Sequence, residues 1–320
     1  MRIFRYAPTP SRLLHVGNGL AAVLGWASAR AAQGRFILRI EDIDLTRCKP
    51  EYTRACLDDL QWLGLDWDEG PYYQSERLAL YDEALTRLAD AGQTYACACS
   101  RAQIRALQRA PHLSPFFADA GKLRPYPGKC RTRELPGPPD GHGGWRLNVQ
   151  AMGGAAVVTV GDRWQPTFDE DVRDTCGDFL LGRPGEPTYQ LAAVVDDRAM
   201  GVSDVVRGHD LMGSTARQLL LHRALDAVEG AREEPVMAHH PLIVDERGRK
   251  LSKRDRALTL AGLRDDGVCP QTFTAWVCAA IGLVDPATVR RMSPRDVVDI
   301  MGESVQRWRD GTLPSCPPKA

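Results

Sequence analysis

Strand and helix patterns alternate from the start of the chain, and this order limits the folds that are open to it. Residues 3–7 are typical of a short strand, residues 17–33 form an alanine-rich stretch typical of a helix, and residues 35–40 again favour a strand. A strand, a helix and a second strand in this order are the building unit of α/β proteins. We therefore predict an α/β fold.

Further along the chain, amphipathic patterns predict two more helices, after which the composition changes. Helical periodicity returns at residues 52–63 and 75–91, where apolar side chains recur on one face. Residues 97–187 are rich in proline and glycine, with short apolar runs such as 155–160. They predict an inserted segment that is irregular at first and stranded later.

The α/β pattern resumes at residue 189. Apolar runs predict strands at residues 191–195 and 202–206, and residues 214–228 predict a helix. After Lys253 the pattern is helical to about residue 309 and ends in a proline-rich tail. The whole order predicts a parallel sheet that is interrupted by an insertion and followed by a small helical region.

Charge and cysteine content narrow the class of protein. The chain has nine cysteines and a formal net charge of zero. It has no stretch of ~18 uninterrupted apolar residues, which a membrane helix needs, and its start lacks the apolar core of a signal peptide. We therefore expect a cytoplasmic protein with free thiols rather than disulfides. Zero net charge argues against a protein coated in positive charge, but it allows local basic patches that bind a phosphate backbone.

A histidine and a glycine stand in the turn between the first predicted strand and helix, as His15-Val16-Gly17-Asn18. Free backbone N–H groups and the helix dipole favour a nucleotide phosphate at such a helix start, and glycine lets the backbone approach it. On its own, the segment fits a helix-capping turn with an incidental histidine better than a nucleotide site.

A basic segment follows much later, as Lys250-Leu251-Ser252-Lys253-Arg254. Mobile lysines on either side of a serine could stabilise the charge that develops on a phosphate as pyrophosphate leaves. A solvated basic loop, or a surface that holds RNA phosphates, explains a basic run of this kind more often.

Three of the cysteines gather in the loop-rich segment. They are Cys97, Cys99 and Cys130. In a cytoplasmic protein, such a cluster favours zinc over a disulfide. Coordination chemistry leaves the fourth ligand open, because Tyr126 is an unusual donor beside three thiolates and His112 or His142 is of the more common type.

Taken together, the histidine and lysine segments resemble the HIGH and KMSKS signatures of class I aminoacyl-tRNA synthetases, in the same order and with room between them for a split nucleotide-binding domain. Residues 39–44, 194–197 and 205–210 resemble the catalytic core of glutamyl-tRNA synthetases. The cysteine cluster with Tyr126 resembles the zinc site of the short glutamyl-queuosine tRNA(Asp) synthetases. The resemblance covers roughly residues 1–256.

This resemblance implies four units. They are a first Rossmann-type catalytic half at residues 1–95, an inserted zinc-containing, acceptor-like subdomain at 96–187, a second half with the KMSKS loop at 188–254, and a helical stem-contact-like region with a tail at 255–320. The stretch after Arg254 is too short for the helical anticodon-binding region of full-length glutamyl-tRNA synthetases as well. We therefore expect that region to be missing.

The resemblance also implies a pocket for L-glutamate. A side-chain carboxylate suits arginine, whose planar fork makes two charge-assisted hydrogen bonds and discriminates against a neutral amide. In the resemblance two arginines fill that role, a glutamate accepts from the substrate's ammonium group, and a tyrosine lines the pocket. The expected set is Arg5 and Arg207, Glu41 and Tyr189, together with Ala7 and Thr9.

The implied reaction is in-line attack of the glutamate α-carboxylate on the α-phosphorus of ATP, which expels magnesium pyrophosphate. A histidine would contact the ATP phosphates, and a lysine would stabilise the transition state from a loop that closes over the site. The expected catalytic set is His15, Gly17, Lys250, Ser252 and Lys253, and the expected ATP-binding set is His15, Asn18 and Lys253.

A structural zinc ion and an unusual RNA acceptor complete what the resemblance implies. The expected zinc ligands are Cys97, Cys99, Tyr126 and Cys130. The short family transfers glutamate to a queuosine base at the wobble position of tRNA(Asp), whose anticodon stem-loop the catalytic core receives. We therefore expect a monomer that activates glutamate without tRNA, with candidate RNA contacts at Arg131, Arg133 and Trp145.

The sequence also departs from the family pattern. Arg12 stands where many relatives carry glycine and could crowd the approach to ATP, whereas Thr9 keeps the hydroxyl of the usual serine. Two other functions stay open: a truncated glutamyl-tRNA synthetase that charges a tRNA 3′ end, and a non-catalytic RNA- or nucleotide-binding paralogue. Retention of both His15 and Lys253 argues against the paralogue.

Overall fold

The computed structural model describes most of the chain. The described residues are 1–109, 125–133, 135–138, 143–244, 258–285, 291–303 and 311–312. Lys250, Ser252 and Lys253 of the predicted site lie outside them, and so do His112 and His142. Within the described part, no helix is both long enough and apolar enough to cross a membrane.

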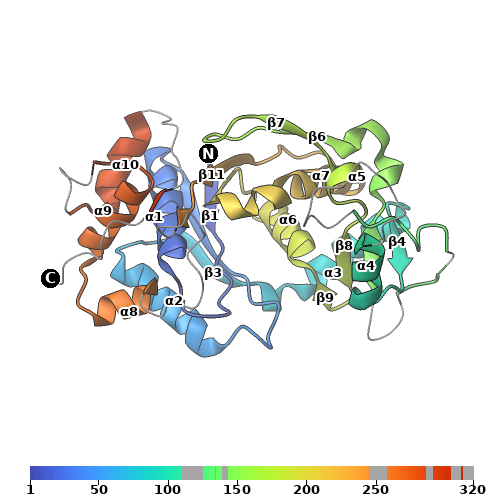
Figure 1. The fold of residues 1–320 in the computed structure, drawn as a ribbon, viewed down its shortest axis with the longest axis horizontal. Coiled ribbons are helices and arrows are strands. Elements are labelled where there is room, and N and C mark those ends of the chain that lie inside the picture. Colours follow the sequence, from blue (N-terminus) through green and yellow to red (C-terminus); the bar gives the residue numbers. More distant parts are fainter. Residues whose placement is uncertain are drawn as a thin grey trace.

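A five-stranded parallel sheet lies at the centre of the fold, in the order β11-β10-β1-β2-β3 (Figure 1). Its strands are β1 (Ile3–Tyr6), β2 (Arg35–Ile40), β3 (Glu69–Tyr73), β10 (Asp204–Gly208) and β11 (Val236–His240). Because parallel strands need crossover connections, helices cover both faces of this sheet. The predicted α/β fold with a parallel sheet is confirmed.

One face of the sheet is covered by α1, which connects β1 to β2 and has the C-terminal helices packed on its outer side (Figure 1). The helices on this side are α1 (Val16–Ala31), α2 (Pro50–Trp62), α8 (Leu260–Asp265), α9 (Pro270–Ala280) and α10 (Pro294–Glu303). Gly19 permits the close contact of α1 with α9, because a Cβ atom there would lie 2.6 Å from Cζ of Phe273. Phe4 and Tyr6 of β1 point into this apolar core.

The opposite face carries α6 (Tyr189–Ala199) and α7 (Met212–Glu229), with α3 (Leu78–Asp90) packed against both. Side chains of β1 alternate between the two faces, as the pleat of a strand requires. Arg5 therefore lies on the α6 side, where it contacts Asp197. The side chains of β1 that face α1 pack in the apolar core, and Arg5 on the face towards α6 is charged.

The chain between β3 and β10 builds a second, antiparallel sheet in the order β4-β5-β8-β9, together with a hairpin. The sheet consists of β4 (Thr94–Cys97), β5 (Gly144–Leu147), β8 (Leu180–Arg183) and β9 (Glu186–Pro187), and the hairpin of β6 (Val157–Val160) and β7 (Phe168–Asp171). The remaining elements are α4 (Arg101–Arg109), α5 (Val172–Thr175), the 3₁₀ helices η1 (Gln74–Glu76), η3 (Val149–Ala156) and η4 (His209–Leu211), and the paired β12 (Ile243–Val244) and β13 (Gly311–Thr312).

The prediction of a strand at residues 191–195 is wrong, because these residues lie inside α6. All of them are buried, since α6 packs against α3, α7 and β8. A helix that is buried on every side shows no amphipathic period, so a short apolar run within it cannot be told from a buried strand. The strand predicted at 202–206 is β10, which begins at Asp204, and the other strands and helices expected up to residue 228 are confirmed to within a few residues at their ends. In the helical region expected from Lys253 to about residue 309, the structure describes α8, α9 and α10, and residues 254–257, 286–290 and 304–309 lie outside the described part.

Candidate active site

The carboxyl ends of the parallel strands meet at one edge of the sheet, beside the N-terminus of α1. Arg5 lies near the end of β1, Glu41 directly follows β2, and Arg207 lies in β10. Ala7 and Thr9 follow β1, and Thr9 is exposed. The strand order reverses between β1 and β10, and open α/β sheets bind their ligands in the crevice at such a point.

His15 directly precedes α1 and caps it. Its Nδ1 accepts a hydrogen bond from the backbone N–H of Gly17 at 3.1 Å, and Oδ1 of Asn18 accepts from the backbone N–H of His15 at 3.1 Å. The helix-capping interpretation is therefore confirmed, and a phosphate site at this helix start stays a prediction. The cap holds the half-buried imidazole over the first helical turn, where N–H groups attract phosphate. Arg12 in the same turn is exposed.

The first described residues after the predicted lysine segment are hydrogen-bonded to this turn through their backbone. Thr259 forms an antiparallel bridge with His15, and the N–H of Leu260 donates to the carbonyl oxygen of Leu14 at 2.9 Å. Thr259 also caps α8, because its hydroxyl accepts from the N–H of Gly262 at 3.1 Å. Residues 259–260 therefore lie beside the start of α1.

A buried ion-pair network lies between β2 and α6. Arg39 is fully buried, and its guanidinium nitrogens lie 2.6 Å from Asp197, 3.2 Å from Glu41 and 3.6 Å from Asp196. Nε of Arg5 approaches the same oxygen of Asp197 to 3.3 Å. Arg5 of β1 and Arg39 of β2 thus share the carboxylate of Asp197 in α6.

The carboxylates of this network differ in how well their charge is compensated. Burial raises the pKa of Glu41 above its ordinary value, and Arg39 and Arg5 offset only part of that effect. Burial also acts to raise the pKa of Asp197, but the same two arginines outweigh it and lower the pKa. Glu41 is therefore the carboxylate that a substrate ammonium group would stabilise most. Thr9 Oγ1 lies 3.5 Å from Glu41 Oε2.

The sequence predicted no role for Arg39 or Asp197, although both lie in segments that resemble the catalytic core of glutamyl-tRNA synthetases. The signal was available in the sequence: an arginine at the end of an apolar strand and a carboxylate at the end of an apolar run are both buried charges that need partners. What the sequence could not supply was the pairing, which joins residues far apart in the chain across β2 and α6.

Arg207 is held by three neutral acceptors. Its Nε donates to Nε2 of His239 at 2.9 Å, one terminal nitrogen donates to Oε1 of Gln218 at 2.6 Å, and the other donates to Oγ1 of Thr215 at 2.9 Å. The residue is 4% exposed and has no carboxylate among these partners. A buried guanidinium without a carboxylate partner is suited to an anionic ligand.

The surroundings of Arg207 connect it to the other predicted substrate residues. Burial lowers its pKa, Tyr189 raises it, Arg5 lowers it and Asp197 raises it. The structure therefore places Arg5 and Tyr189 within electrostatic reach of Arg207, and Glu41 within electrostatic reach of Arg5.

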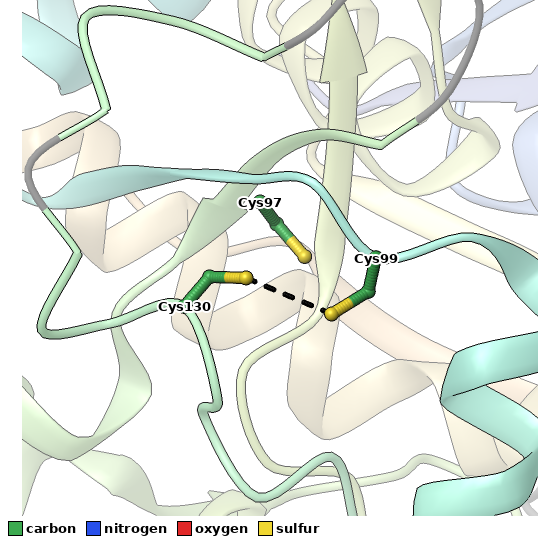
Figure 2. A group of neighbouring side chains, drawn as sticks. All are labelled: Cys97, Cys99 and Cys130. Carbon is green, nitrogen blue, oxygen red and sulfur yellow. Dashed lines mark hydrogen bonds between the residues drawn. The ribbon is translucent and has the colours of Figure 1, made fainter.

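The three clustered cysteines lie together in the second sheet region, and Figure 2 shows their sulfur atoms pointing towards one another. The sulfur atoms lie within 4.8 Å of each other, and those of Cys99 and Cys130 are 3.6 Å apart. The hydroxyl oxygen of Tyr126 lies 3.5 Å from the sulfur atoms of both Cys97 and Cys99. No disulfide joins the cysteines among the described residues.

These distances fit a tetrahedral metal site. With Zn–S bonds of about 2.3 Å and a Zn–O bond of about 2.0 Å, tetrahedral geometry places sulfur atoms about 3.8 Å apart and an oxygen about 3.5 Å from each sulfur. The thiols of Cys97, Cys99 and Cys130 and the phenol of Tyr126 are all buried. The donor set can therefore hold a metal ion, with Tyr126 in the fourth position.

Two arginines lie next to this cluster and contact Tyr126 and Asp178. The guanidinium carbon of Arg146 lies 4.0 Å from the centre of the Tyr126 ring, and Arg131 donates to Oδ2 of Asp178 at 2.6 Å. Asp178 is fully buried and also accepts from the hydroxyl of Tyr95 at 2.7 Å. Arg131 therefore forms an internal ion pair, a contact that its sequence position did not indicate.

The other two predicted RNA contacts make no such ion pair among the contacts of the described residues. Arg133 is exposed, and Trp145 in β5 is half-buried, like Arg131, and packs against the apolar core of the second sheet region.

Comparison with known proteins shows the family. The catalytic-domain model of the class I tRNA synthetases for E and Q matches residues 3–120 and 176–294. The Glutamyl-Q tRNA(Asp) synthetase of Symbiobacterium thermophilum is 41% identical, with 96% of this chain and 98% of that protein covered. The protein of the same name from Nitratidesulfovibrio vulgaris is 38% identical, with 98% and 94% covered.

Full-length relatives extend beyond this chain. The glutamate–tRNA ligase of Synechococcus elongatus is 39% identical over 85% of this chain, but the match spans only 56% of the ligase. The crystal structure of a glutamate tRNA ligase from Elizabethkingia meningosepticum in complex with its amino acid superimposes with a TM-score of 0.75 and 26% identity, covering 96% of this chain and 66% of that one. The chain belongs to the class I tRNA synthetases for glutamate and glutamine, and within them to the Glutamyl-Q tRNA(Asp) synthetases, which it matches over nearly their whole length.

Proposed function

We propose that the protein activates L-glutamate with ATP in the absence of tRNA and transfers the glutamyl group to queuosine at the wobble position of tRNA(Asp). The observation that carries the proposal is the strand-end site, where the buried arginines Arg5 and Arg207 lie with Glu41 beside the capped start of α1. The full-length match to relatives named for this reaction supports the acceptor.

Each group of the pocket has a distinct task in this proposal. Arg207 and Arg5 bind the side-chain carboxylate of glutamate, and they discriminate against glutamine because an amide would leave charged donors unsatisfied. Glu41 accepts from the ammonium group, Tyr189 lines the pocket, and Ala7 and Thr9 form its outer wall.

The nucleotide binds along the start of α1. His15 contacts the phosphates of Mg-ATP, and Gly17 and Asn18 shape the turn that approaches them. The α-carboxylate of glutamate then attacks the α-phosphorus and releases magnesium pyrophosphate. Lys250, Ser252 and Lys253 act from the segment that precedes Thr259, the residue that bridges to His15. Lys253 stabilises the charge on the leaving pyrophosphate.

A zinc ion on Cys97, Cys99, Tyr126 and Cys130 has a structural role in this proposal: it ties the end of β4 to the segment that carries Cys130. We also propose that residues 1–95 and 188–254 form the two catalytic halves, that 96–187 form an inserted acceptor-like subdomain, and that 255–320 form a stem-contacting region. The proposed enzyme is a cytoplasmic monomer.

The acceptor is tested by labelling. Radioactive glutamate, ATP and the protein are incubated with tRNA(Asp) that contains queuosine, with tRNA(Asp) that lacks it, and with tRNA(Glu), and the labelled RNA is digested with ribonuclease. We expect label only in the anticodon fragment of queuosine-containing tRNA(Asp). Label at the 3′ end of tRNA(Glu) would instead identify a truncated glutamyl-tRNA synthetase, and activation without any transfer would contradict the proposed acceptor.

A further inference from the structure

A histidine and an aspartate that have no assigned role stand directly behind Arg207. His239 lies beside Arg207 in the register of β10 and β11, and its side chain is fully buried. Asp162 follows β6 in the hairpin region, and its Oδ2 lies 2.5 Å from Nδ1 of His239. The line Asp162–His239–Arg207 thus runs from the hairpin into the proposed glutamate pocket.

The hydrogen bonds determine which nitrogen of His239 carries the proton. Nε of Arg207 is always a donor, so Nε2 of His239 must accept from it, and the remaining proton must lie on Nδ1. Burial lowers the pKa of His239, which favours the neutral ring that this arrangement needs. The Nδ1–H then donates to Asp162, an acceptor that selects this tautomer.

The same contacts determine where Arg207 can bind a ligand. A guanidinium has five N–H groups, and His239, Thr215 and Gln218 each accept from a different nitrogen. The acceptors on His239 and Thr215 lie 3.2 Å apart, so together they occupy the side edge of the fork. The two N–H groups at the end of the guanidinium, away from His239, form the end-on fork that matches a carboxylate. The side chain of Tyr189 is a further hydrogen-bonding partner of Arg207.

We propose that Asp162 and His239 are positioning residues that hold the end-on fork of Arg207 towards the side-chain carboxylate of glutamate, and so contribute to its selection over glutamine. The inference rests on the proposed role of Arg207 in binding glutamate. It gives the hairpin that carries Asp162 a part in amino-acid recognition, although this hairpin lies outside the parallel sheet.

Asp162 also has a local structural contact, because its Oδ1 accepts from the N–H groups of Trp164 and Gln165 at 2.8 and 2.9 Å. Asp162→Asn separates the two roles. The asparagine oxygen can keep the turn, but its amide then presents a donor to His239, which forces the proton onto Nε2 and against Arg207. A purely structural role predicts no effect of this variant on glutamate binding.

The experiment uses pyrophosphate exchange with the full chain. It measures the KM values for glutamate and for ATP, and the ratio of kcat/KM for glutamate to that for glutamine. For Asp162→Asn and His239→Leu we expect the glutamate KM to rise about 10- to 100-fold, the usual effect of losing a hydrogen bond to a charged group, with the ATP KM unchanged. His239→Gln should keep the glutamate KM well below that of His239→Leu, because its amide donates to Asp162 and its oxygen accepts from Arg207. Asp169→Ala, in an exposed part of the same hairpin, is the matched control.

The outcomes separate the inference from the proposed function. If the wild-type protein activates glutamate and Asp162→Asn leaves the glutamate KM and the glutamine ratio unchanged, the positioning role is refuted while the function stands. If the KM values for glutamate and ATP rise together, and the melting temperature falls in His239→Gln as well as in His239→Leu, the two residues have a structural role only. If the wild type activates no glutamate, the proposed function fails and the inference fails with it.

Discussion

Replacing Arg39 with methionine should destabilise the protein strongly and in a pH-dependent way. The variant keeps the volume of the aliphatic stem but leaves Glu41 and Asp197 without their main cationic partner, in a site where Arg39 is fully buried and Asp197 is 14% exposed. Asp196 keeps its closer partner Arg77 at 2.7 Å. Removing one side of a buried ion pair typically costs about 3–5 kcal/mol, because the remaining charge stays buried without compensation. We expect a loss of this size in the free energy of unfolding at pH 8, measured by urea denaturation.

The control for Arg39→Met is Arg30→Met, which removes an arginine that pairs with Asp66 and Asp68 near the surface. Such partly exposed pairs contribute about 0–1 kcal/mol each, so this variant should lose far less stability. Without Arg39, burial should raise the pKa values of Glu41 and Asp197, so the destabilisation should be smaller at pH 5 than at pH 8. A loss below about 1 kcal/mol, or one that does not change with pH, would refute the role given to Arg39.

Four further predictions test the site. Arg207→Lys should raise the glutamate KM at least ~10-fold and narrow the preference over glutamine, because an ammonium group cannot bind a carboxylate through a planar fork; pyrophosphate exchange with both amino acids measures it. His15→Asn should keep the helix cap, and hence the melting temperature, but lower kcat, whereas equal kcat would leave His15 with capping alone. Because the pKa of Glu41 is raised, the glutamate KM should increase as the pH falls through that pKa, and Glu41→Gln should remove this limb of the pH profile. Chelation of metal, or Cys130→Ser, should lower the melting temperature, and a metal analysis showing no zinc in the purified protein would contradict the proposed zinc site.

The order of strands and helices was largely predictable because local pattern determines it. The run at residues 191–195 was the exception: α6 is buried on all sides, so its apolar residues carry no period that separates a helix from a strand. The short antiparallel strands could be expected only as a stranded region, since their pairing depends on contacts between distant residues.

Single residues that carry a motif could be proposed for the site from the sequence, whereas partners that meet only in the folded chain could not. His15 and Glu41 could be named from the sequence, but the pairing of Arg39 with Asp197 and of Arg207 with His239 depends on which residues face each other across the sheet and its covering helices. Arg131 shows the reverse case, because a residue that looked like a surface cation donates to the buried Asp178.

The central claim is that this chain activates glutamate by itself. The most direct measurement is the exchange of pyrophosphate into ATP with purified protein and magnesium and without tRNA, with glutamate as substrate and aspartate and glutamine as controls. We expect exchange with glutamate alone, and we expect Arg207→Lys to weaken it. Exchange that appears only when tRNA(Glu) is added would contradict tRNA-independent activation, and no exchange under any condition would show that the strand-end site does not activate glutamate.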